Sequence, residues 1–356
     1  MLDVRIAKCS LYKFVVHRTF NIAHRFSFAA KLNVFFRMKK IAIIDLGTNG
    51  FRLYIAEVPT VGTFNIIHRE TSDLKIASEG FDRIGDAPFE RGLAAMRQFS
   101  TQLKNFNVEK IEAFGTAALR LASNGGEFMD TVERETGIKI QLISGEREAE
   151  LIYKGMRLGF LQKNRPPEEK SGQAISKKPI FQEKTPVLMV DVGGGSVEFI
   201  IGDAEKVHWA RSFNVGVTIL KQNFQPNPLI QHAEITTIEQ FLTANCADLL
   251  EAIAHFQPKI PVVACGTFDF LIKILRGNPL ENFEFSKQQF DAFYQQMTFI
   301  SETELLKIPD IPKEKVEMLA VSFVLLDWIM QILKADRLIS SAFSMKAGIL
   351  HEMSLD

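Results

Sequence analysis

The chain has 356 residues, of which 46% are hydrophobic and 24% are charged, and its formal net charge is zero. This composition is that of an ordinary globular protein and argues against disorder, and the length suits two domains. The first 37 residues hold seven basic residues and one acid, so 35 basic and 41 acidic residues remain in the rest. Because this remainder lacks a positive field, no nucleic-acid partner is expected.

The first 37 residues form a basic extension that is separate from the globular part. They lack a compact apolar block followed by small residues, so a secretory signal is not expected. Two interpretations stay open: an organelle-type presequence, or a stretch translated ahead of a true start at Met38. The second is favoured, because Met38-Lys39-Lys40 leads straight into an apolar strand.

Cysteine spacing and hydropathy indicate a cytoplasmic protein. Cys9, Cys246 and Cys265 lie far apart and form neither a zinc-binding nor a disulfide pattern, which fits a reducing compartment. The longest apolar run, residues 318–333, is interrupted by Asp327 and is shorter than the roughly 20 residues of a membrane span. It predicts a buried helix, and no membrane partner is expected.

Apolar patterns predict an α/β unit over residues 38–160. Strands alternate with helices in this part of the chain, as in layered α/β domains. The predicted strands cover residues 41–46, 51–58, 64–71, 111–114 and 138–143, and the predicted helices cover residues 89–106 and 146–158. Residues 163–184, with three prolines among many charges, predict a solvated loop between two domains.

Residues 161–356 predict a second α/β unit. The expected elements are a hairpin at residues 187–202, long helices near residues 238–255 and 313–334, a strand at residues 337–341 and a terminal helix at residues 345–353. The terminal helix is free, in this interpretation, to pack back on the first domain.

The two units share an internal repeat. Residues 41–55 (IAIIDLGTNGFRLYI) align without gaps on residues 187–201 (VLMVDVGGGSVEFII), and each copy predicts two strands joined by an Asp-x-Gly turn. The pair Gly115-Thr116 recurs as Gly266-Thr267 at a similar distance from the start of its copy. We therefore interpret the chain as one ancestral unit used twice.

The glycine-rich turns of the repeat predict phosphate binding. Without a Cβ, backbone N–H groups can approach an anion closely. A glycine cluster alone is a common turn, but two copies that face one another would hold a run of phosphates from both sides. The predicted phosphate-binding residues are Gly47, Thr48, Asn49, Gly193, Gly194, Gly195, Ser196, Gly266 and Thr267.

An acidic residue ends the first strand of each copy. Asp45 and Asp191 lie where an unpaired carboxylate would be costly to bury. They either cap their own turns or hold Mg²⁺, directly or through water, since hard cations take oxygen ligands. The repetition of the acid favours a metal role, and Glu198 on the following strand is expected to join them.

Two further segments supply candidate catalytic groups. Arg120 follows Gly115-Thr116 closely and is either a surface residue or a cleft guanidinium that neutralises a transferred phosphoryl group. The acids Glu146, Glu148 and Glu150 open a helix, where the helix dipole alone would favour them. Hydrolysis also needs a positioned general base, and composition does not choose among the three glutamates.

These motifs resemble the exopolyphosphatase and guanosine pentaphosphate phosphatase (Ppx/GppA) family, a branch of the superfamily of actin, sugar kinases and heat-shock chaperones. The resemblance runs from about Met38 to the C-terminus and is carried by IDLGTN at 44–49, GTAALR at 115–120, ISGEREA at 143–149 and DVGGGSVE at 191–198. Kinases of the superfamily bind nucleotides across similar turns, but the ISGxxEA segment is typical of the phosphatases and favours hydrolysis.

The resemblance implies two ribonuclease-H-like domains of the actin-like ATPase type, with the substrate in the cleft between them. It implies that Glu148 activates the attacking water and that Arg120 lies in the cleft. The metal, Mg²⁺ or another divalent cation, would be held by Asp45, Asp191 and Glu198. The expected reaction releases terminal phosphate from polyphosphate or guanosine pentaphosphate.

Several positions depart from the family pattern. Gly50 stands where Ser or Thr is usual, residues 340–348 lack the usual Asp and Arg, and residues 312–316 lack a common Arg-x-Asp pattern. These departures leave a second hypothesis open, a sensor that binds guanosine tetra- or pentaphosphate with little or no catalysis. The sequence allows a homodimer without fixing the oligomeric state, and it does not choose between polyphosphate and guanosine pentaphosphate.

Overall fold

The first of two mixed sheets has five strands in the order β3-β2-β1-β4-β5. The strands are β1 (Lys39–Leu46), β2 (Gly50–Val58), β3 (Asn65–Asp73), β4 (Lys110–Gly115) and β5 (Ile140–Leu142), so all five predicted strands are confirmed within a few residues. β1 and β4 pair in parallel, as do β4 and β5, whereas β2 and β3 are antiparallel. β1 is central, and its apolar residues are buried as a strand covered on both faces requires.

The computed structural model describes residues 38–161, 185–224, 229–268, 271–272, 282–308 and 311–356, and residues 40–356 form one compact unit. The expected basic extension at 1–37 and the expected loop at 163–184 lie outside the described residues.

The second sheet has six strands in the order β10-β11-β9-β6-β7-β8. Its strands are β6 (Val187–Val192), β7 (Val197–Gly202), β8 (Val207–Phe213), β9 (Pro261–Cys265), β10 (Phe283–Ser286) and β11 (Arg337–Ser340). β6 is antiparallel to β7 and parallel to β9, and β9 is parallel to β11. Apart from the added edge strand β10, this order repeats that of the first sheet. Both halves therefore have the ribonuclease-H-like arrangement, and the predicted duplication is confirmed.

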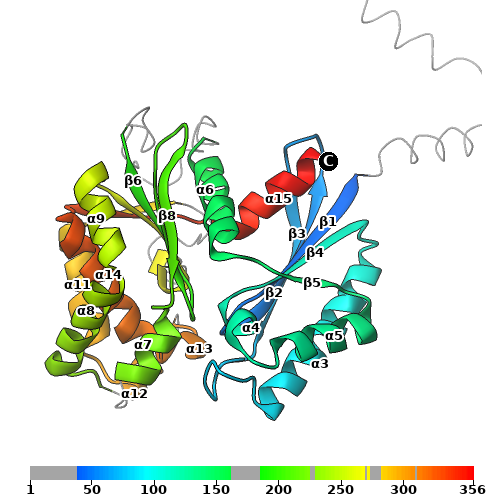
Figure 1. Cartoon of the computed structure of the whole chain (residues 1–356), viewed down its shortest axis with the longest axis horizontal. Coiled ribbons are helices and arrows are strands. Elements are labelled where there is room, and N and C mark those ends of the chain that lie inside the picture. The colour runs from blue at the N-terminus through cyan, green and yellow to red at the C-terminus, as the bar shows by residue number, and fades with distance from the viewer. Residues whose placement is uncertain (1–37, 162–184, 225–228, 269–270, 273–281, 309–310) are drawn as a thin grey trace, which may run out of the picture. The chain divides into compact units, whose positions relative to one another are not determined.

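Helices on the first sheet close an apolar core. α3 (Asp86–Asn105) confirms the helix predicted at 89–106, and its buried side chains pack with those of α5 (Gly125–Thr136) in one cluster with strand residues. α5 and the short α4 (Ala117–Leu121) were not predicted. Figure 1 shows α3 and α5 side by side next to this sheet.

Two predicted long helices of the second half are each divided, and those predictions are wrong in extent. The helix expected near 238–255 is α8 (His232–Asn245) followed by α9 (Ala247–Phe256), because the backbone leaves helical geometry at the buried Cys246. The helix expected at 313–334 is α13 (Lys313–Val316) followed by α14 (Leu319–Leu333). Twelve of the 15 residues of α14 are buried, which confirms the predicted buried helix.

The remaining helices of the second half, α7 (Val217–Phe224), α11 (Lys287–Thr298) and α12 (Glu302–Leu305), were not predicted. α7 and α12 have only eight and four residues, which is too short for a helical period to be recognised in sequence. α7 follows β8, and its first turn reaches the glycine-rich turn described below.

α6 (Gly145–Leu161) and α15 (Met345–Leu355) lie side by side and share an apolar core with both sheets (Figure 1). Ile43 of the first sheet and Met189 of the second belong to the same cluster as Met156 and Leu350 of the two helices. The terminal helix is thus as predicted. The predicted domain boundary at residue 160 stays a prediction, because α6 contacts strands β6, β7 and β8 of the second half.

Glycine allows the backbones of α6 and α15 to meet. A Cβ on Gly348 would lie 2.1 Å from the carbonyl oxygen of Leu151, and a Cβ on Gly155 would lie 2.1 Å from that of Ser344. Such contacts cannot be relieved by a side-chain rotation, since the atoms that would be struck belong to backbone. Any larger residue must separate the two helices.

Gly348→Ala is therefore expected to lower the free energy of unfolding by about 1–3 kcal/mol or more, the usual cost of overpacking. The measurement is chemical denaturation monitored by circular dichroism. Gly126→Ala is the matched control, because Gly126 is also helical and has nothing within 4 Å of an added Cβ. The control should gain up to about 1 kcal/mol. Equal stability of the two variants would contradict the close packing.

Candidate active site

A cavity of about 540 Å³ lies at the ends of strands β1 and β6, between the two sheets. It collects residues from all the motifs that the sequence singled out. Of the predicted site residues, those that line it are Asp45, Gly47, Thr48, Asn49, Glu148, Asp191, Gly193, Gly194, Gly195, Ser196, Glu198, Gly266 and Thr267. Arg120 does not line the cavity itself but contacts Glu148.

The two glycine-rich turns have the same local geometry. The N–H of Gly47 donates to the carbonyl of Gly50 at 3.2 Å, and the N–H of Gly193 donates to the carbonyl of Ser196 at 3.0 Å. These bonds occupy matching positions in the repeat. The duplicated sequence therefore folds into a duplicated turn.

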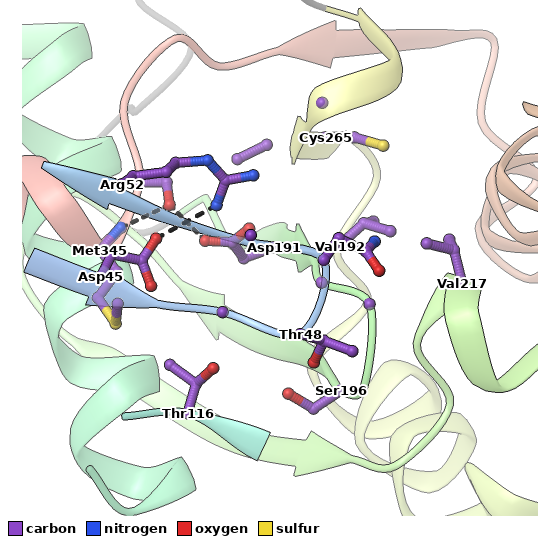
Figure 2. A pocket seen from close by; sticks show the side chains of 18 of the residues that line it. Asp45, Thr48, Arg52, Thr116, Asp191, Val192, Ser196, Val217, Cys265 and Met345 are labelled. Carbon is purple, nitrogen blue, oxygen red and sulfur yellow. Dashed lines mark hydrogen bonds and ion pairs between the residues drawn. The ribbon is translucent and has the colours of Figure 1, made fainter. Parts of the chain in front are cut away.

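The two turns touch one another. A Cβ on Gly195 would lie 3.0 Å from Thr48 Oγ1, and a Cβ on Gly194 would lie 3.0 Å from the Asn49 side chain. Figure 2 shows the hydroxyls of Thr48 and Ser196 on the two turns at one end of the cavity. The predicted facing arrangement of the turns is thus present, and glycine is required in the second turn because the first turn packs against it.

The second turn presents N–H groups in a form suited to an anion. Its carbonyl oxygens at Gly193 and Gly194 accept from the N–H groups of Val217 and Thr218, at 3.0 and 2.9 Å. Among the described residues, no acceptor is found for the N–H groups of Gly194 and Gly195. A turn whose carbonyls are in use and whose N–H donors are open has the arrangement found in backbone anion sites.

The second strand of each hairpin carries an ionisable residue at the same repeat position. Arg52 in the first copy corresponds to Glu198 in the second, each seven residues after the aspartate. Arg52 forms an ion pair with Asp45, with 3.3 Å between Nη1 and Oδ2 (Figure 2). Sequence reasoning missed Arg52, although the ungapped repeat alignment places it opposite Glu198.

In the second copy, by contrast, two acids face one another. Asp191 and Glu198 are register partners on β6 and β7. Like charges directly opposite on paired strands are destabilising, so this pair needs a compensating cation or protonation. Burial raises the pKa of Glu198 to about 7, and Asp191 adds to the rise, while hydrogen bonds from Ser196 and Ser212 oppose it.

Asp191 is stabilised by hydroxyl and cationic neighbours. Burial raises the pKa of its carboxyl, and a hydrogen bond from Ser344 Oγ together with the charge of Lys346 lowers it. Ser344 is also the N-cap of α15, where its Oγ accepts from the N–H of Met345 at 2.6 Å. The terminal helix therefore begins at the cavity and holds one of the predicted metal ligands.

Glu148 is the one buried acid of the three at the start of α6. Its side chain is 8% exposed, whereas Glu146 is exposed and Glu150 pairs with Lys154 at 2.5 Å on the surface. Glu148 Oε2 is buried without a hydrogen-bond partner among the described residues. Burial raises the pKa of this carboxyl well above its ordinary value, Glu198 adds to the rise, and Arg120 opposes it.

A hydrogen bond to the backbone carbonyl of Ile143 orients the Arg120 side chain toward Glu148. Its Nη1 donates to the carbonyl of Ile143 at 2.7 Å and lies 3.6 Å from Glu148 Oε2. α4, which carries Arg120, begins directly after β4, so the short strand-to-helix turn brings the guanidinium to the first turn of α6. Arg120, which was expected in the cleft, thus lies beside Glu148 rather than on the cavity wall.

Two lysines at the cavity were not predicted. Lys315 comes from α13 and lies against Gly266, where a Cβ would be 2.9 Å from its Nζ. Lys346, in the first turn of α15, lies over the ring of Tyr54 at 5.4 Å. Both are in segments that the sequence marked only as departures from the family pattern. The cavity wall thus combines five carboxylates, those of Asp45, Asp73, Glu148, Asp191 and Glu198, with the cations of Arg52, Lys315 and Lys346.

Gly50, another departure, has a steric explanation. A Cβ at this position would lie 2.5 Å from the carbonyl oxygen of Ser72, because β2 and β3 pair from Gly50 and Asp73 onward. A Ser or Thr here would push β3 away. The hydroxyl that family members usually have at this position is therefore incompatible with the β3 seen in this chain.

Within the described ranges, no three His, Cys, Asp or Glu side chains are grouped closely enough to hold a metal by themselves. Nor does any helix in the described part of the chain have the length and apolarity needed to cross a membrane.

The fold and the cavity together define a two-lobed, ribonuclease-H-like protein whose cavity is lined by paired glycine-rich turns. The chain belongs to the Ppx/GppA phosphatase family, whose sequence model matches residues 54–166 and 172–356. It is accordingly a phosphatase, and the predicted family is confirmed.

Individual relatives agree with this assignment. A Haemophilus influenzae protein with exopolyphosphatase in its name is 23% identical over 319 residues, which cover 89% of this chain and 92% of that one. A guanosine-5'-triphosphate,3'-diphosphate pyrophosphatase of Aeromonas hydrophila is 32% identical over 187 residues, 51% of this chain and 33% of that one.

Solved structures show the same fold. A crystal structure of an exopolyphosphatase from Cytophaga hutchinsonii has a TM-score of 0.79 at 25% identity and covers 89% of this chain and 98% of its own. The Aquifex aeolicus member of the Ppx/GppA family has a TM-score of 0.68 at 20% identity, with 89% of this chain and 98% of that one covered. The second likeness concerns the fold alone.

Proposed function

We propose that the protein is a Mg²⁺-dependent phosphohydrolase that releases terminal phosphate from inorganic polyphosphate, guanosine pentaphosphate or both. The observation that carries the proposal is the placement of Glu148. It is a buried carboxylate, held beside Arg120, at a cavity that two paired glycine-rich turns also line. A base, a guanidinium and an anion site in one cavity suit water attack on a phosphoanhydride.

The turns supply the phosphate site in this proposal. N–H groups of Gly194 and Gly195 and the hydroxyl of Thr48 donate to phosphate oxygens, and Ser196, whose hydroxyl donates to Glu198, lines the same space. Lys315 and Lys346 at the cavity wall add positive charge for the rest of a polyanion. Gly266 and Thr267 border the same space from the second half.

Mg²⁺ fits the donor set of the second hairpin. Asp191 is half-buried and Glu198 is buried, and the two acids face one another on paired strands, whereas Asp45 has Arg52 opposite it. Mg²⁺ usually takes one or two protein carboxylates and completes its shell with water and substrate phosphates. When bound there, it would supply charge neutralisation of the phosphates. Asp191 and Glu198 would hold it, and Asp45 would act through water.

Glu148 and Arg120 have different roles in the proposed reaction. Burial makes Glu148 a stronger base than an ordinary carboxylate, so that its Oε2 accepts a proton from the attacking water. Arg120 orients this carboxylate from 3.6 Å and offers a fixed positive charge to the transferred phosphoryl group. The products are inorganic phosphate and a substrate shortened by one phosphate.

Two further predictions concern the location and the oligomeric state of the protein. The buried thiol of Cys246 supports a reducing, cytoplasmic location. Homodimer formation stays a prediction that size measurement in solution would test.

A phosphate-release assay with both substrates tests the proposal. Inorganic polyphosphate and guanosine pentaphosphate are compared side by side while Mg²⁺ is titrated, and phosphate is measured directly. We expect release from at least one substrate, with strict dependence on the cation. Tight binding of guanosine pentaphosphate without any release would instead favour the sensor hypothesis, and activity in the presence of a chelator would contradict the metal role.

A further inference from the structure

α7 joins the two phosphate-binding turns to one another. Its first turn is bonded to the second glycine-rich turn through backbone groups: Val217 and Thr218 donate to the carbonyls of Gly193 and Gly194. The chain also approaches closely at Gly216, where a Cβ would lie 2.2 Å from the carbonyl oxygen of Gly194. The start of α7 and the second turn therefore form one rigid body.

Side chains on the same helix reach the first half. Thr218 Oγ1 donates to Asn49 Oδ1 at 2.8 Å, so the bond crosses from the second half to the first turn. One helical turn later, Gln222 Nε2 donates to the carbonyl of Ala77 at 2.9 Å. Residues four apart lie on one face of a helix, so a single face of α7 makes both contacts.

The first turn is itself bonded to the segment that Gln222 contacts. The N–H groups of Leu74 and Lys75 donate to the carbonyl of Asn49 at 3.0 and 2.9 Å, and that of Ile76 donates to the carbonyl of Thr48 at 3.0 Å. A contact that fixes Asn49 or Ala77 therefore also fixes the position of the first turn.

We propose that α7 is a clamp that holds the two phosphate-binding turns together, and that Thr218 is its main positioning residue. Thr218 is 5% exposed, and its hydroxyl is close to both turns, since a Cβ on Gly194 would lie 2.8 Å from Thr218 Oγ1. With the clamp intact, the donors of both turns are already in place when a phosphate arrives. Without it, substrate binding must also draw the turns together.

This inference rests on the proposed function, and its test separates the two. Thr218→Val removes the hydroxyl and keeps the β-branched shape, while Thr218→Ser keeps the hydroxyl. Thr237→Val is the matched control, because Thr237 is exposed on α8 and, among the residues that the structure describes, its hydroxyl donates only to the Ala233 carbonyl of its own helix. Each change is also made in a Glu148→Gln parent, so that binding of inorganic tripolyphosphate with Mg²⁺ can be followed by calorimetry without turnover.

Thr218→Val should weaken tripolyphosphate binding and raise KM by about two- to tenfold, the range that one hydrogen bond supplies. We expect kcat to change less than KM, because Thr218 does not touch the reacting atoms. Thr218→Ser and Thr237→Val should match their parents. If Thr218 had only a structural role, Thr218→Val would lower thermal stability and leave the ratio of KM to kcat unchanged.

Unchanged tripolyphosphate binding in Thr218→Val would overturn the clamp while leaving the proposed function in place. Loss of binding in Thr218→Ser as large as in Thr218→Val would also overturn it, since the hydroxyl would then not be the group that matters. Failure of the Glu148→Gln parent to bind tripolyphosphate, together with no phosphate release by the unmodified protein, would overturn the proposed function and with it the role of the clamp.

Discussion

Glu148→Gln is expected to lower phosphate release by about 10²- to 10⁴-fold, because the amide cannot accept a proton from water. The side chain keeps its volume, so the protein should fold normally. Removing a buried, partly unsatisfied carboxylate should even leave it slightly more stable. The measurement is kcat for phosphate release together with a thermal unfolding curve.

Glu146→Gln provides the control for this change. Glu146 lies in the same helical turn but is exposed. It should retain the activity of the unmodified protein. If Glu148→Gln kept near-normal turnover, Glu148 would not be the base, and another carboxylate of the cavity would have to be tested.

Glu198→Gln is expected to have the largest effect on stability, and the effect depends on pH. The pKa of Glu198 is raised from 4.5 to about 7 in the folded protein, so the folded state binds this proton more tightly than the unfolded state. The free energy of unfolding therefore falls as the pH rises from 4.5 to about 7. Above this range the ionised carboxylate lowers the free energy of unfolding by about 3 kcal/mol. Glutamine does not ionise and avoids this loss.

Glu198→Gln should accordingly become more stable relative to the unmodified protein as the pH rises from about 5 to about 8. The quantity compared is the free energy of unfolding. Denaturant titrations without Mg²⁺ measure it, and Glu146→Gln, whose side chain is exposed, should show no such growth. Adding Mg²⁺ should stabilise the unmodified protein more at the higher pH, since carboxylate ligands must be deprotonated, and Glu198→Gln much less. A pH-independent difference would contradict the buried acidic pair.

The pair of acids in the second hairpin, which destabilises the fold, can be explained by function. The first hairpin pairs an acid with Arg52, whereas the second pairs Asp191 with Glu198. Two copies of one ancestral hairpin thus differ at the position where the first has a built-in cation and where, in the proposed function, the second binds one. Residues that destabilise a fold are expected at sites that serve function.

Much of the architecture could be predicted from local pattern alone. Alternating apolar runs gave the five strands of the first sheet, and the long, strongly periodic α3 was predicted within three residues at its start. The short helix α7 and the strand β8, whose burial does not alternate along the strand, were missed. α8 and α9 were merged, since nothing in the sequence around Cys246 marks the break.

The sequence alone determined the repeated turns and their acids, because the requirement for glycine at a close approach and for an acid after a strand is local and leaves its mark in neighbouring residues. Tertiary structure alone decided which of three glutamates is buried at the cavity, that Arg120 faces Glu148, and that Thr218 bridges to Asn49. Those relations join residues far apart in the chain. They depend on burial and on distances of a few ångströms, which packing sets and which spacing along a sequence does not encode.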